Sequence, residues 1–146
     1  MCNFYAAKES ASNEETIDFV MECPTKTLSQ IQRQVLEEEI SEKEICETMQ
    51  QIQKGKAPGP NGIPIDLFHK IAPEIAKALK EMYTEAWGKG ELSEDIHTAT
   101  IVIIPKARKP RNKCDSYRPI SLLNAEAKII AKVLANRLGK VIRTLV

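Results

Sequence analysis

The 146-residue sequence is poor in aromatic side chains and has no long apolar run. Aromatic residues make up only 5% of the chain, so we expect an aliphatic core, or one that a neighbouring domain completes. No stretch approaches the ~18 consecutive apolar residues of a membrane-spanning helix, and no membrane contact is expected. The first residues lack a basic segment followed by an apolar one, so we expect no secretory signal peptide. These absences predict an intracellular protein, without a choice between nucleus and cytoplasm.

Closely spaced metal ligands are missing as well. The four cysteines, Cys2, Cys23, Cys46 and Cys114, lie far apart in the sequence and form no Cys-x-x-Cys pair. The two histidines are also isolated from each other and from the cysteines. Because zinc sites need close ligand pairs, we expect free thiols and no metal site.

Charge is distributed unevenly, although the net charge of the whole chain is only +1. Residues 1–53 contain eleven acidic and four basic residues, whereas residues 104–146 contain two acidic and eleven basic residues. The cationic end suggests a polyanionic partner such as a nucleic acid. The same cations could instead be a solvated surface, or could face the acidic N-terminal helices. Charge alone does not decide between these interpretations.

Hydrophobic residues at helical spacing predict helices through the first two thirds of a chain that is about one domain long. The clearest start is Ser41, which is followed three residues later by Glu44, as in a capping box. This helix is expected to end at Gly55. Trp87 is expected in the core or in contact with another domain. In this part of the chain, helices are expected over residues 13–21, 27–38, 41–55, 65–71 and 74–87.

The last third of the sequence predicts two strands and a long helix. A β-branched run closed by Pro105 and an extended piece that contains Pro119 predict an antiparallel hairpin of residues 98–104 with residues 117–122. Asn124 can cap the helix that follows. The expected apolar stripe of this helix consists of Ile130, Val133, Leu134, Leu138, Val141, Ile142 and Leu145, and the cations expected mostly off it are Lys128, Lys132, Arg137, Lys140 and Arg143.

Residues 54–64 are expected to form a stiff, thin loop. Pro58 and Pro60 fix their own φ angles, and Gly62 can adopt a positive φ. One interpretation is a tight connection between two helices. The other is a rigid loop that lies close to a nucleic-acid backbone, with contacts from Lys54, Lys56, Gly59, Asn61 and Gly62.

Four blocks of sequence occur in a characteristic order: KGKAPGPNGIPIDLFHK at 54–70, IPK at 104–106, SYRPISLLN at 116–124 and AKIIAKVLANRL at 127–138. Together they resemble the fingers region of reverse transcriptases from non-LTR retrotransposons, most closely the long-interspersed-element type. The resemblance covers essentially the whole chain and is strongest from about residue 40 onward. The family more often has aspartate where this chain has Asn61.

The resemblance implies roles for the cations of the last third. Arg118 and Lys106 match family positions that contact the phosphates of the incoming nucleotide, a task that suits the planar, doubly donating guanidinium of arginine. For Arg118 the alternative is a salt bridge with Asp115 or Glu126. The loop between the strands would bind phosphates without reading sequence, with plain solvated charge as the alternative. Its cations are Arg108, Lys109, Arg111 and Lys113.

The resemblance also implies a separate palm domain, whose paired aspartates hold the Mg²⁺ ions of polymerisation. Here no two aspartates are adjacent, and the last acidic residue is Glu126. We therefore assign no catalytic and no metal-binding residue, and expect the chain to be inactive alone. The implied partners are an RNA template, DNA, a nucleoside triphosphate and the missing palm and thumb. Mg²⁺ is implied only for the full-length parent.

Taken together, the sequence predicts an α+β fold that is mostly helical, with one small antiparallel β-hairpin. Residues 1–39 would be a helical connector, and residues 40–146 the N-terminal, fingers part of a reverse transcriptase domain. Two other functions are compatible with the sequence. One is a non-enzymatic nucleic-acid-binding module, a relic of a retroelement. The other is a helical interaction module that uses its acidic N-terminal helices, whose binding would not depend on salt.

Overall fold

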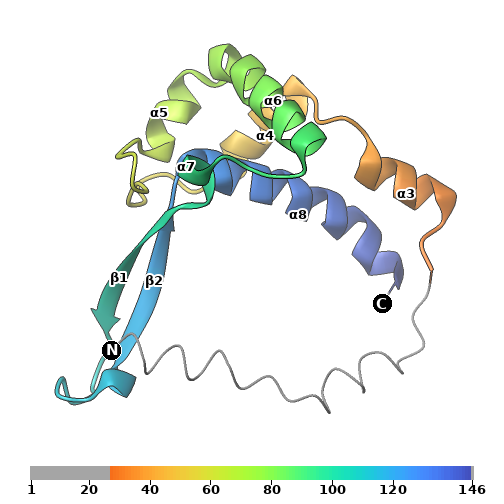
Figure 1. The fold of residues 1–146 in the computed structure, drawn as a ribbon. Coiled ribbons are helices and arrows are strands. Elements are labelled where there is room, and N and C mark those ends of the chain that lie inside the picture. Colours follow the sequence, from red (N-terminus) through yellow and green to blue (C-terminus); the bar gives the residue numbers. More distant parts are fainter. Residues whose placement is uncertain (1–26, 146) are drawn as a thin grey trace.

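A body of helices carries a two-stranded sheet that extends away from it (Figure 1). The computed structural model describes residues 27–145, so the helix expected over residues 13–21 lies outside the described residues. The predicted α+β fold, mostly helical with a small antiparallel hairpin, is confirmed. The elements in chain order are α3 (Gln30–Glu37), α4 (Glu42–Gln51), α5 (Ile65–Lys70), α6 (Ala72–Lys89), α7 (Glu94–His97), β1 (Ala99–Pro105), the 3₁₀ turn η1 (Cys114–Ser116), β2 (Tyr117–Leu123) and α8 (Ala125–Leu145).

Side-chain caps fix the starts of the first two helices. At α3, the Ser29 hydroxyl accepts from the Gln32 N–H at 3.3 Å, and the Gln32 side chain accepts from the Ser29 N–H at 2.8 Å. The reciprocal capping box therefore lies at α3, where Ser29 and Gln32 also fit the S-x-x-Q pattern but were not predicted to form it. At α4, the Ser41 hydroxyl accepts from the Glu44 N–H at 3.2 Å, as predicted. The Glu44 carboxylate, however, binds Arg137.

Two helix ends differ from the expected ones. Helix α4 ends at Gln51, earlier than the predicted Gly55. Helix α6 continues to Lys89 and is ended by Gly90, whose φ of 74° suits a residue without a side chain. Trp87, in the last turn of α6, is 67% exposed, so the expectation that it belongs to the core is wrong. Its alternative role, a contact with another domain, stays a prediction.

The core lies where α4 packs on both α6 and α8. Ile45 of α4 and Ile129 of α8 are fully buried, and most of the other core residues are aliphatic, as the low aromatic content predicted. Phe68 of α5 and Tyr83 of α6 are aromatic members of the core. The Tyr83 hydroxyl donates to the Glu126 carbonyl at 2.8 Å, so this buried polar group is satisfied. Burial raises the pKa of the Tyr83 hydroxyl, which therefore stays neutral.

The buried face of α8 is turned relative to the predicted stripe. Leu134, Leu138 and Ile142 belong to that stripe but are between 38% and 49% exposed. Arg137, expected among the outward cations, is only 5% exposed. The pattern fails here because it counts every arginine as a surface residue, whereas this one is neutralised by Glu44. The buried residues that lie four apart along α8 are Ala125, Ile129, Val133, Arg137 and Val141.

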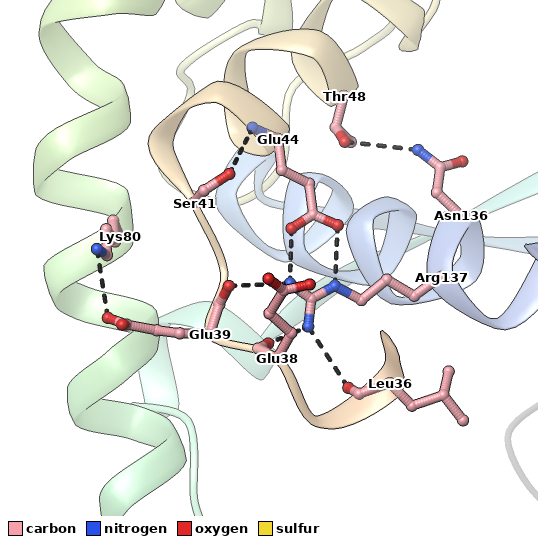
Figure 2. A network of polar contacts seen from close by, with 9 residues as sticks. All are labelled: Leu36, Glu38, Glu39, Ser41, Glu44, Thr48, Lys80, Asn136 and Arg137. Carbon is pink, nitrogen blue, oxygen red and sulfur yellow. Dashed lines mark hydrogen bonds and ion pairs between the residues drawn. The ribbon is translucent and has the colours of Figure 1, made fainter. Parts of the chain in front are cut away.

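Arg137 ties the N-terminal helices to α8 (Figure 2). Its guanidinium donates to both carboxylate oxygens of Glu44, from Nε at 2.9 Å and from Nη2 at 2.7 Å. The same group donates to the backbone carbonyls of Leu36 at 3.4 Å and Glu39 at 3.2 Å, and to that of Glu38. The hydrogen bond from Arg137 lowers the pKa of the Glu44 carboxyl. One buried cation thus satisfies a carboxylate and three carbonyls at once.

Further polar contacts hold the segment between α3 and α4 and the second half of α4 in place (Figure 2). Lys80 of α6 forms an ion pair with Glu39 at 3.3 Å. Asn136 of α8 donates to Thr48 at 3.5 Å and to Gln51 at 3.0 Å, both on α4. The segment around Glu39 is therefore bound from α6 on one side and from α8 on the other.

The hairpin pairs β1 with β2 in the predicted antiparallel arrangement. Its register runs from Ala99 opposite Leu123 to Pro105 opposite Tyr117, within one residue of the predicted bounds. Aliphatic side chains are exposed on both faces, because consecutive strand residues point to opposite sides. The exposed aliphatic residues of the hairpin are Ile101, Val102, Ile103, Ile104 and Ile120.

Within residues 27–145, no helix is long and apolar enough to span a membrane.

The loop of residues 54–64 fixes the base of the hairpin to the helical body. A Cβ atom at Gly59 would lie 2.4 Å from the backbone nitrogen of Asn124, so the loop backbone touches the junction of β2 and α8. The Asn61 N–H donates to the Asn124 side-chain oxygen at 3.1 Å. The Asn61 amide also donates to both carboxylate oxygens of Glu126 at 3.3 Å. Segments some sixty residues apart in sequence are thereby joined.

Replacing Arg137 by methionine should destabilise the fold by about 3 kcal/mol, because it leaves a half-buried carboxylate and three carbonyls without their donor. Urea unfolding followed by circular dichroism measures this change. The matched control is Lys43→Met, because Lys43 makes only an exposed ion pair with Glu47 at 3.9 Å. The control should change stability by no more than about 0.5 kcal/mol. Equal losses in the two variants would contradict the role of Arg137.

Acid should weaken the same contact. Because Arg137 holds the pKa of Glu44 below its ordinary value of 4.5, the unfolded chain takes up this proton at a higher pH than the folded chain. The stability that the Glu44–Arg137 pair contributes is therefore present above the ordinary pKa of 4.5. It is lost as the pH falls through the lower pKa that Glu44 has in the folded chain. The free energy of unfolding should drop more steeply for the wild type than for Glu44→Gln between about pH 5 and pH 3. Parallel curves would refute this expectation.

A single methyl group at Gly59 should disturb the loop. Gly59→Ala would place its Cβ against backbone atoms of Leu123 and Asn124, and overpacking of this kind costs about 1–3 kcal/mol. Gly88→Ala is the matched control, because its Cβ meets nothing within 4 Å and the residue lies inside α6. There, alanine should stabilise the helix by up to about 1 kcal/mol. Thermal unfolding compares the two variants, and a neutral Gly59→Ala would show that the close approach is not needed.

Candidate nucleic-acid interface

The far end of the hairpin carries the predicted cationic loop. Residues 106–116 connect β1 to β2 there, and the four predicted loop cations all have exposed side chains. The loop therefore presents positive charge at the tip of an arm that stands clear of the helices (Figure 1). The cations of this tip loop are Arg108, Lys109, Arg111 and Lys113.

Arg118 lies next to the tip loop and is exposed. It sits on β2 opposite Ile104, one pair away from the end of the ladder. The alternative of a salt bridge with Asp115 or Glu126 is not observed in the described part of the chain. The Lys106 ammonium lies 4.0 Å from the Asp115 carboxylate, and the Asn61 amide donates to Glu126. Within residues 27–145, the Arg118 side chain makes no hydrogen bond or ion pair. Its guanidinium is available to an external anion.

Lys106 is placed at the same end of the hairpin as Arg118. Its backbone N–H donates to the Ser116 carbonyl at 2.7 Å, which continues the ladder one pair beyond Pro105. Residues 104 and 106 of one strand share a face with residue 118 of the other, so Lys106 and Arg118 are diagonal neighbours. The Lys106 side chain is half-buried, and its ammonium donates to the Asp115 carbonyl at 2.8 Å. Part of its donor capacity is thus used inside the protein.

Lys54 and Lys56 lie at the opposite end of the hairpin. They belong to the first part of the 54–64 loop, which packs on the β2–α8 junction, where the Lys128 ammonium also donates to the Ala57 carbonyl at 3.4 Å. Since β1 has seven residues, roughly 20 Å of hairpin separates this junction from the tip. The predicted nucleic-acid-binding residues therefore form two cationic groups and not one.

Three other residues of the 54–64 loop were predicted as nucleic-acid contacts. Gly59 and Asn61 are used in packing on Asn124 and Glu126, so both have an observed structural role. Gly62 has a φ of 71° and open space around it. The interpretation of this segment as a connection between helices is supported, since it joins α4 to α5. A nucleic-acid contact from any of the three stays a prediction.

Tyr117 begins β2, directly next to the tip loop. Its hydroxyl donates to the Arg111 carbonyl at 2.9 Å, across the tip loop. Asn124 was expected as a helix cap. Its carbonyl accepts from the Lys128 N–H at 3.2 Å, and its side-chain oxygen accepts from Asn61. A hydrogen bond between distant segments, such as that between Asn61 and Asn124, leaves no trace in local sequence patterns.

Other side chains of the last third lie away from the tip. Lys140 and Arg143 are exposed on α8, whereas Arg137 is buried and belongs to the core of the body. Cys46 and Cys114 are not joined in a disulfide. In the described part of the chain, no three His, Cys, Asp or Glu side chains converge as a metal site would require.

No protein-family model matches this chain, but proteins of known transposons resemble it. The "Transposon TX1 uncharacterized 149 kDa protein" of Xenopus laevis is 30% identical over 115 residues, which cover 79% of this chain and 9% of that protein. The "Probable RNA-directed DNA polymerase from transposon BS" of Drosophila melanogaster is 28% identical over 98 residues, which cover 67% of this chain and 11% of that protein. The chain spans about a tenth of the length of these relatives. It is thus a distant homologue of non-LTR transposon proteins.

Proposed function

We propose that this chain is the fingers part of the RNA-directed DNA polymerase of a non-LTR retrotransposon of the long-interspersed-element type. Residues 40–146 would form the N-terminal part of the polymerase domain, and residues 1–39 a helical connector. The observation that carries the proposal is the exposed cationic tip of the hairpin, on a chain homologous to a probable RNA-directed DNA polymerase. The role of the chain is to bind phosphates, of the template strand and of the incoming nucleotide.

Arg118 is the better supported of the two nucleotide-binding candidates. Phosphoryl transfer spreads negative charge over the phosphate oxygens, and fixed cations stabilise that charge. Arg118 is exposed beside the tip, and a guanidinium can donate two parallel hydrogen bonds to a phosphate. Lys106 is its neighbour on the same face, but its ammonium already donates to the Asp115 carbonyl. Lys106 would therefore add positive charge, while Arg118 would make the directional contact.

The two cationic groups fit a strand of nucleic acid that follows the hairpin. The tip cations would hold phosphates at one end, and Lys54 and Lys56 would hold them roughly 20 Å away at the base. Such contacts depend on charge and spacing, so they bind any sequence. The catalytic carboxylates and the Mg²⁺ ions that they hold would belong to a palm domain, since this chain corresponds to about a tenth of its relatives.

Removing tip cations should weaken binding and reduce its dependence on salt. The variant Lys109→Gln/Arg111→Gln/Lys113→Gln keeps Arg108, whose φ of 59° makes substitution there harder to interpret. A labelled single-stranded RNA is titrated by fluorescence anisotropy at several salt concentrations. Each lost phosphate contact should lower the slope of log affinity against log salt by about 0.7. Arg118→Glu, tested alone, should also weaken binding.

Matched controls keep the net charge change but move it to the helical body. Lys43→Gln/Lys70→Gln/Lys77→Gln removes three exposed cations of α4, α5 and α6. Arg33→Glu reverses one exposed charge on α3 and matches Arg118→Glu. Both controls should bind almost as the wild type does. If the tip variants and the body variants weaken binding equally, only net charge matters and the proposed interface is wrong.

A further inference from the structure

The tip loop is closed by hydrogen bonds from several directions. At its start, Lys106 donates from the backbone to the Ser116 carbonyl at 2.7 Å and from its ammonium to the Asp115 carbonyl at 2.8 Å. Near its end, the Ser116 N–H donates to the Lys113 carbonyl at 3.0 Å. These bonds join the two ends of the loop, but they leave its middle, around Arg111, to be held by something else.

Tyr117 holds that middle. Its hydroxyl donates to the Arg111 carbonyl at 2.9 Å, while its side chain is half-buried at the end of the ladder opposite Pro105. An aromatic ring that is fixed at a strand end is a rigid support, because only two torsions position its hydroxyl. The cations next to the bonded carbonyl are therefore held at a fixed distance from the sheet.

The loop backbone is consistent with one enforced conformation. Arg108 has a φ of 59°, in the left-handed region that a residue with a long side chain rarely adopts. Such a residue keeps this conformation when its surroundings determine it. The bonds from Lys106 and Tyr117 on the two sides of Arg108 provide those surroundings.

We propose that Tyr117 is a positioning residue of the phosphate-binding loop: its hydroxyl fixes the loop before the nucleic acid arrives. This inference rests on the proposed function of the tip cations. A loop that is already ordered loses less conformational entropy when it binds, so the same charges bind more tightly. The Tyr117 ring need not touch the nucleic acid for this effect, and the hydroxyl reads no base.

The test is Tyr117→Phe, which removes one oxygen atom and keeps the ring and every cation. Affinity for the labelled single-stranded RNA should fall about threefold to tenfold, the loss expected when one hydrogen bond no longer orders the loop. The slope of log affinity against log salt should stay that of the wild type, because no cation is removed. Amide exchange of the tip-loop backbone, measured without RNA, should become faster.

Tyr83→Phe is the matched control. It also removes a tyrosine hydroxyl, which donates to the Glu126 carbonyl in the core and not to the tip loop. This control should lower the unfolding temperature while leaving RNA affinity and tip-loop exchange unchanged. If it reduced affinity as much as Tyr117→Phe does, general destabilisation would explain both variants and the inference would be wrong.

Other outcomes separate this inference from the proposed function. If Tyr117→Phe binds as the wild type does while the triple glutamine variant of the tip binds weakly, the inference fails and the proposed function stands. If Tyr117→Ala is weak but Tyr117→Phe is normal, the ring stacks on a base and the positioning role of the hydroxyl is refuted. If the triple glutamine variant binds normally, the proposed function itself fails, and the inference with it.

Discussion

The ion pair between Glu44 and Arg137 determines how the helical body is put together. Its guanidinium occupies a position on α8 that would otherwise belong to an apolar side chain, and it holds α4 and the end of α3 there. A charge so well buried is tolerated only when its donors are all used, and here the carboxylate and the carbonyls use them. With Arg137 on its buried side, α8 places Ile129 and Val133 in the core and leaves Leu134 and Leu138 exposed.

The hairpin depends on the same body through a second contact. Helix α8 begins directly after β2, so the orientation of its first turn sets the direction in which the hairpin leaves the helices. The 54–64 loop fixes this turn by bringing Gly59 and Asn61 against Asn124. The tip cations are therefore positioned in two steps. The body places α8, and the loop places the junction from which the hairpin extends.

Much of the fold could be predicted from local sequence. Helix periodicity, the β-branched run before Pro105 and the capping serine at Ser41 each act over a few residues, and each indicated its element within a few positions. The orientation of α8 could not be predicted, because a buried arginine looks like a surface one until its partner some ninety residues away is known. The exposure of Trp87 also depends on the arrangement of distant elements. Hydrophobicity predicts burial only where other elements supply a surface to cover the side chain.

For the candidate site too, local signals could be predicted from the sequence and contacts between segments could not. The sequence placed the tip cations and Arg118 on one hairpin. It could not show that the Tyr117 hydroxyl binds the tip loop or that Gly59 serves packing, since both roles depend on contacts between segments.

The exposed hairpin has one more consequence. Within residues 27–145 no further strand pairs with either outer edge, and both faces are aliphatic, so copies at high concentration can add strand to strand into larger sheets. The repulsion between the like-charged tips opposes this growth, and salt, which screens it, should favour precipitation.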